Sequence, residues 1–247
     1  MKILLWWGCL LVAPAILISI EVFHPSGFTA DPGMYQYLSH PEHHEAKFSA
    51  FTYFGPRWWF VMHMIQTPMV GLVGVGLLFT VDGIGAKDGT GAKVAARLAR
   101  ATIFVFVIYF TVLDAIGGIG LGRTILVVQQ LAAGGKLDPH QLAGVELLLN
   151  TLWVDPVIGG VGSFVSETAS WAAFAASLFI AAALLLSGRV PSDLEGWVNM
   201  AVLVAFGWQL QIAHASPHGP IAFALLIVAA GWIRWRAARN RRFLEAV

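Results

Sequence analysis

Three of the eight histidines lie within five residues of one another, in the segment SHPEHHE (Ser39–Glu45). Neutral imidazole is the commonest metal ligand in proteins, so this segment could bind a metal ion. Ser39 and Glu42 form a capping-box pattern, and a helix from His40 to about Phe51 would place the imidazoles on one face. The same pattern is typical of a helix that lies on a membrane surface with its polar face in water.

Polar side chains also interrupt the most apolar parts of the chain. They are His63, Gln66, Asp114, Glu167, Gln209 and His214. A polar or ionisable group inside a bilayer is costly, so each of these side chains indicates a functional site. A hydrogen-bonded polar cluster that fixes helix packing is the alternative interpretation of this set.

The composition is that of an integral membrane protein. The 247 residues are 57% hydrophobic and 12% charged, about half the charged share of a soluble domain. The net charge of +1 gives no indication of nucleic-acid binding. The single cysteine, Cys9, excludes an internal disulfide and any Cys-rich zinc or iron–sulfur site.

Six apolar segments are at or close to the length of roughly 17–25 residues that crosses a bilayer as a helix. They are Ile3–Ile20, Arg57–Thr80, Leu98 to about Gly122, Phe164–Leu186, Trp197–Ala215 and Pro220–Trp235. Because backbone polar groups must be paired in lipid, each segment is predicted to be helical. We therefore expect an all-α, polytopic membrane helix bundle in one domain, residues 1–247, with external loops at about 21–56 and 123–163. Cleavage at the small residues Ala13–Ala15 would leave five spans, but the uninterrupted ILISI that follows favours an uncleaved anchor.

Lysine and arginine predict the orientation of these six spans. One side of the membrane would hold eleven of them, namely Lys2, Lys87, Lys93, Arg97, Arg100, Arg189, Arg234, Arg236, Arg239, Arg241 and Arg242. The other side would hold Lys47, Arg57, Arg123 and Lys136. This asymmetry predicts a multi-pass protein of the inner (plasma) membrane with both termini in the cytoplasm. All eight histidines would then lie on or near the external face.

A second amphipathic helix is predicted in the later external loop, at about Pro139–Trp153. Asp138 is a favourable N-cap, and Pro139 fits the first helical position. Leucine and valine recur at helical spacing from Leu142 to Leu152. We expect this helix to lie over the external mouth of the bundle and to cover a histidine site there.

The favoured function is a site near the external face, lined by histidine and carboxylate, that binds haem b or, second, a divalent metal such as zinc or copper. His63 and His214 would enter the bilayer at similar depth on two helices, as axial ligation of a b-type haem requires. Electron transfer would be a natural role. The candidate metal ligands are His63, His214, His218, Asp114 and Glu167, and a secondary set is His24, His40, His43 and His44.

Two other functions stay open. His63, Asp114, His214 and His218 are similar in residue type to the ligands of the ceramidase–adiponectin-receptor superfamily, which implies an intramembrane zinc-dependent hydrolase. This chain departs from that family in having Pro217 inside its HxxxH and six predicted spans instead of seven. The third function is an accessory subunit or scaffold without catalytic activity. Beyond the lipid bilayer, the expected partners are a membrane complex or a second copy of the chain.

Overall fold

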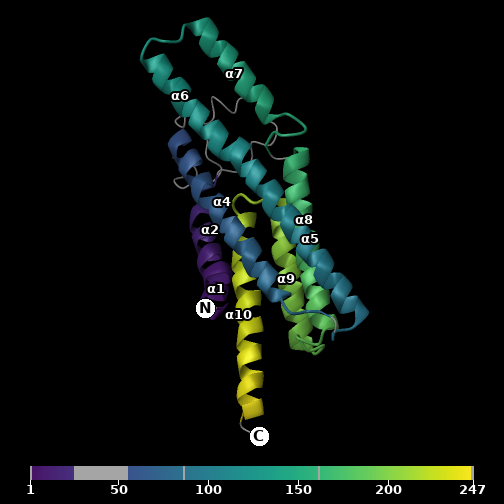
Figure 1. Ribbon diagram of the computed structural model, residues 1–247. Helices are drawn as coiled ribbons and strands as arrows, with labels where there is room; N and C mark the ends of the chain where they lie inside the picture. The colour runs from purple at the N-terminus through teal and green to yellow at the C-terminus, as the bar shows by residue number, and fades with distance from the viewer. Residues whose placement is uncertain (1, 25–54, 86, 161, 246–247) are drawn as a thin grey trace.

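The computed structural model describes residues 2–24, 55–85, 87–160 and 162–245, and every regular element in these ranges is a helix (Figure 1). The helices are α1 (Lys2–Trp7), η1 (Gly8–Val12), α2 (Ala13–Glu21), α4 (Gly55–Thr80), α5 (Thr90–Leu113), η4 (Asp114–Gly120), α6 (Leu121–Ala133), α7 (Pro139–Trp153), α8 (Phe164–Leu186), α9 (Leu194–Ile212) and α10 (His218–Glu245). The predicted all-α membrane bundle is confirmed. The helix predicted from His40 to about Phe51 lies outside the described residues.

Among the described residues, five helices are long and apolar enough to cross a membrane. They correspond to five of the six predicted spans. The remaining one, α9, is a 19-residue helix that packs against both α8 and α10. Glu195, Asn199 and Gln209 lower its apolar character, although its position inside the bundle matches the predicted fifth span.

The third span is much longer than its apolar segment. Residues Thr90–Ala133 form one helix of 44 residues, or roughly 66 Å at 1.5 Å per residue, which is about twice the thickness of a bilayer core. We expected this span to end near Gly122. It continues because no proline interrupts it and because Leu121, Ile125 and Val128 remain buried. The helix ends at Ala133, and Gly135, two residues later, adopts a positive φ of 65°.

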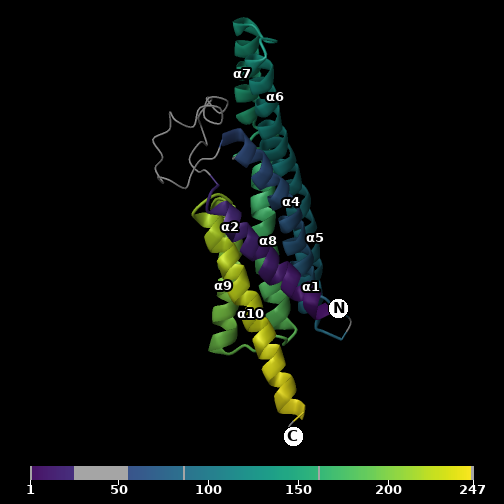
Figure 2. The ribbon, with the colours of Figure 1, turned by 90° about the vertical axis from the view of Figure 1, so that its left-hand side faces the viewer.

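The helices α6 and α7 form a hairpin that projects beyond the other helices (Figures 1 and 2). The capping box at the start of α7 is complete: Asp138 accepts from the backbone N–H of Gln141, and the Gln141 side chain accepts from the N–H of Asp138. The predicted helix at Pro139–Trp153 is therefore present. Its predicted position across the bundle mouth is wrong, because it runs alongside α6 in the projecting hairpin.

Small side chains allow close packing in the centre of the bundle. Ala96 and Ala99 on α5, and Ala169, Ala173 and Ala176 on α8, are almost fully buried, and these two helices lie against each other. Small residues are typical of helix contacts in membranes because they let backbones approach closely. On the other side of the bundle, α10 packs against α9 and α2.

Both termini lie toward the same end of the bundle, together with the α4–α5 and α8–α9 connections (Figures 1 and 2). The end of α2, the start of α4 and the α9–α10 connection lie at the opposite end. This second end contains His24, His63 and His214.

Candidate functional site

Three histidines from three distant segments meet at the end of the bundle opposite the termini. His24 follows α2, His63 lies in the third turn of α4, and His214 lies in the connection between α9 and α10. The ring centroid of His24 is 5.4 Å from that of His63 and 5.0 Å from that of His214. His24 and His63 are buried, and His214 is half-buried. The structure thus brings together both predicted axial ligands and one histidine from the secondary set.

Two contacts fix the position of the His63 ring. Its Nδ1 lies 2.7 Å from the carbonyl oxygen of Trp59. Because a carbonyl only accepts, Nδ1 carries the hydrogen, and Nε2 keeps the lone pair with which a neutral imidazole binds a metal. On its other side, the ring lies against the backbone of Gly118, where an added Cβ would fall 2.2 Å from it.

The neighbouring π-helical turn η4 provides the backbone against which His63 packs. The indole N–H of Trp59 donates to the carbonyl oxygen of Gly117, over 3.0 Å. This bond ties α4 to η4 directly beside His63. Single π-helical turns inside α-helices occur frequently at functional sites. Here the turn also places Asp114, its first residue, in the interior of the bundle.

His214 is held by aromatic packing. Its ring lies 5.4 Å from that of Phe110 on α5, in an edge-to-face arrangement, in addition to its contact with His24. His218, predicted to act with His214, instead pairs with Gln209 on α9: its Nδ1 lies 2.8 Å from the amide oxygen and donates to it.

Two carboxyl groups are buried in the same region. Asp114 is 1% exposed, and its Oδ2 accepts from the hydroxyl of Thr67 over 3.1 Å. Glu21, in the last turn of α2, is fully buried. Among the described residues, neither oxygen of Glu21 nor Oδ1 of Asp114 has a hydrogen-bond partner, and the same holds for the amide of Gln66. Such unpaired buried groups are costly, which indicates a role other than packing.

The other predicted ligands lie elsewhere. Glu167 is exposed in the first turn of α8, and the predicted ligand set of His63, His214, His218, Asp114 and Glu167 is not assembled as one group. His40, His43 and His44 lie outside the described residues. Within the part of the chain that is described, no group of three or more His, Cys, Asp or Glu side chains has ligand atoms arranged to hold a metal ion. The imidazoles contact one another edge to face instead.

Sequence reasoning missed Glu21 and Trp59. Glu21 and His24 lie three positions apart at the end of the first apolar segment. Because residues at this spacing share one face of a helix, the pair was a usable signal for a site. Trp59 lies at the start of the second apolar segment, where tryptophan commonly forms an aromatic belt at the membrane interface, yet its ring lies 4.7 Å from that of His63 and 5.2 Å from that of His24. A belt residue and a site residue have the same appearance in sequence.

Comparisons of the chain with protein-family models, with curated proteins and with solved structures found no match. The geometry of the site is therefore the basis for a functional proposal.

Proposed function

We propose that His24, His63 and His214, named here the histidine cluster, bind one transition-metal ion, zinc or copper, at one end of a membrane helix bundle. The observation that carries this proposal is the spacing of the rings. The ring centroid of His24 lies 5.4 Å from that of His63 and 5.0 Å from that of His214, and imidazoles on one tetrahedral metal, with bonds of roughly 2.0–2.1 Å, have centroids about 5 Å apart.

Binding would require the rings to turn but not to move apart. Their present edge-to-face contacts do not point three nitrogens at one position. Rotation about χ2 of histidine is a soft motion with broad minima. The rings of His24 and His214 can therefore turn toward His63, whose bond to Trp59 holds its ring and selects the tautomer in which Nε2 is the ligand.

The position of His24 favours a single ion over haem b. Axial ligation would need His63 and His214 to face each other across a porphyrin. The ring of His24 already contacts the rings of both His63 and His214. The same residue that adds a third ligand for an ion thus competes for space with a haem.

A second candidate function is the zinc-dependent hydrolase, and the buried carboxyl groups favour it. Three histidine ligands leave one position of a tetrahedral zinc open for water. Asp114 or Glu21 would then be the candidate general base, since each has carboxyl oxygens without a hydrogen-bond partner among the described residues. Substitution by its amide of the one that acts as the base would abolish hydrolysis while leaving zinc bound.

The orientation belongs to the same proposal. The end of the bundle with both termini also has the α4–α5 and α8–α9 connections, which contain Lys87 and Arg189. The positive-inside rule then places that end in the cytoplasm and the histidine cluster on the external side of an inner membrane. The bilayer covers the apolar outer surfaces of the helices, and association with a membrane complex or a second copy remains a prediction.

The direct test is the metal content and zinc affinity of the purified full chain in detergent. We expect about one zinc ion per chain, and an affinity reduced at least about tenfold by His24→Ala, His63→Ala or His214→Ala. The matched control is His140→Ala, since His140 is exposed on α7, away from the cluster. Equal zinc binding by all four variants and the parent chain would contradict the proposal.

A further inference from the structure

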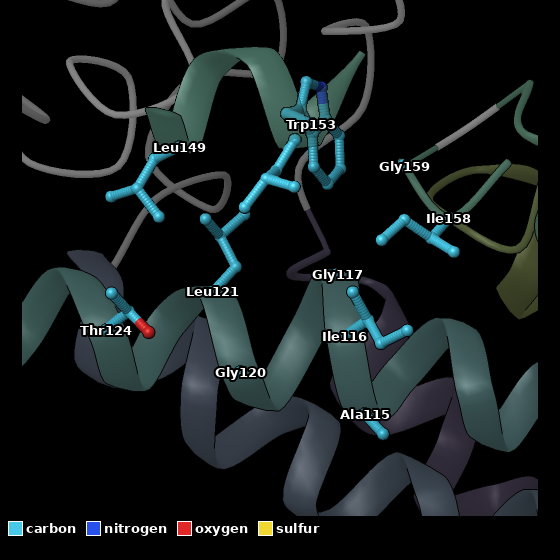
Figure 3. Close-up of a pocket in the computed structure, with 12 residues that line it drawn as sticks. Ala115, Ile116, Gly117, Gly120, Leu121, Thr124, Leu149, Trp153, Ile158 and Gly159 are labelled. Atoms are coloured by element: carbon cyan, nitrogen blue, oxygen red, sulfur yellow. The ribbon is translucent and has the colours of Figure 1, made fainter. Parts of the chain in front are cut away.

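A cavity of about 340 Å³ lies between the π-helical turn and the base of the projecting hairpin (Figure 3). Ala115, Gly117 and Leu121 line it on the side of η4 and α6. Leu149 and Trp153 of α7, with Ile158 of the following loop, line it from the opposite side, as the close-up shows. The histidine cluster does not line this cavity.

Glycines create the space and hold its cover. Gly117 and Gly120 remove side chains from the face of the turn that borders the cavity. At Gly160 an added Cβ would fall 2.5 Å from the Trp153 ring, so the loop passes directly across the indole. Asp155 stabilises this loop by accepting from the backbone N–H groups of Val157 and Ile158, over 2.8 and 2.9 Å.

The lining determines the chemistry of an occupant. Among the lining residues, Thr124 has the only hydroxyl, none is charged, and the others are aliphatic, glycine or tryptophan. The volume is at the low end of the range of about 300–1,000 Å³ for small-molecule sites. A slot of this size and composition fits a hydrocarbon chain, and it provides no charged group for a polar headgroup.

The surroundings identify the source of that chain. One wall belongs to the helix Thr90–Ala133, which is long and apolar enough to cross a membrane. On the hairpin side, Leu152, which lines the cavity, is 42% exposed, and its neighbour Leu148 is 58% exposed. The cavity thus lies beside exposed leucines of the hairpin and beside a membrane-spanning helix, so an acyl chain of a lipid at the membrane surface is the apolar occupant within reach.

We propose that this cavity binds one acyl chain of a membrane lipid. The occupied cavity would support Trp153, whose ring lies 6.2 Å from that of Trp59, the residue that packs on His63. The proposal does not depend on metal binding, because no residue of the histidine cluster lines the cavity.

The test uses the full chain in nanodiscs that contain phosphatidylcholine with a photoreactive diazirine in one acyl chain. Labelled peptides are quantified by mass spectrometry. Labelling at Phe104, a lipid-facing residue that is 66% exposed on α5, is the reference. We expect residues 115–124 and 149–160 to be labelled together and above this reference.

Ala115→Trp should fill the cavity and remove the excess labelling, leaving Phe104 labelling unchanged. Thr124→Phe is a second filling variant, so the result does not depend on the folding of one protein. The control is Val127→Trp, which adds the same bulk at an exposed position of α6 outside the cavity. Labelling of the two segments at or below the Phe104 level, or excess labelling that persists in both filling variants, would overturn the proposal.

Discussion

The imidazole of His63 packs directly against the Cα of Gly118, so closely that a Cβ at Gly118 would lie 2.2 Å from the ring. The contact joins α4 to the π-helical turn, and the hydrogen bond from Trp59 to Gly117 reinforces it. The position of the candidate ligand therefore depends on the absence of one side chain on a different helix. This relationship leads to the first prediction.

Gly118→Ala should displace the His63 ring and lower zinc affinity, because the added methyl group occupies the position of the imidazole. Gly117→Ala is the matched control on the same turn, where the nearest side-chain atom to an added Cβ is 3.7 Å away, on Trp153. Isothermal titration with zinc measures both variants. Equal affinities in the two proteins would show that the contact does not position the ligand.

A topology reporter tests the orientation. An enzyme that is active only outside the cytoplasm should be silent when fused after Val247 and active when inserted after Gly135, at the tip of the hairpin. Both positions follow from the positive-inside rule applied to the end of the bundle with the termini. Activity after Val247 and silence after Gly135 would reverse the orientation and place the histidine cluster on the cytoplasmic side.

The capping box of α7 should contribute to the local stability of the hairpin. Asp138→Ala removes the acceptor for the Gln141 backbone N–H, and loss of an N-cap costs about 1 kcal/mol. Amide hydrogen exchange at the start of α7 should become faster by the factor that corresponds to this loss of about 1 kcal/mol. Exchange in α8 should stay the same. His140→Ala, an exposed neighbour that makes no cap, is the control. Unchanged exchange in the Asp138 variant would mean that the cap does not limit opening.

The loop after α7 should loosen at low pH. The backbone N–H groups of Ile158 and Val157 lower the pKa of Asp155 below its ordinary value of 3.8. A lowered pKa means that the stabilisation is present above the unfolded value and is lost as pH falls through the lower, folded value. Protection of the loop amides, corrected for intrinsic exchange, should therefore decrease below pH 3.8. Asp155→Ala should show weaker protection without this pH dependence, and an identical pH profile in both proteins would refute the assignment.

The sequence was sufficient for the membrane-spanning helices and for α7, because hydropathy and capping are local properties. Asp138, Pro139 and Gln141 specify the start of α7 within four residues. The length of the third span was underestimated because the chain stays helical past its most apolar part, through Ile125 and Val128. Local patterns also did not determine the direction in which the hairpin projects.

The site was only partly predictable, since it depends on tertiary contacts. His63, His214 and Asp114 were recognisable as ionisable groups in apolar segments. The contribution of His24 arises from the way α2 packs against α4 and α10, which periodicity does not encode. The burial of Glu21 and the separate pairing of His218 with Gln209 have the same origin.

X-ray absorption spectroscopy of the zinc-loaded full chain is the most direct test of the proposed metal site. We predict about one bound zinc with three imidazole nitrogens at roughly 2.0–2.1 Å, and a spectrum with fewer imidazoles after His24→Ala. The His140→Ala spectrum should match that of the parent chain. A zinc-loaded protein with no more than one imidazole ligand, or a spectrum that His24→Ala leaves unchanged, would contradict the claim that the three histidines share a metal.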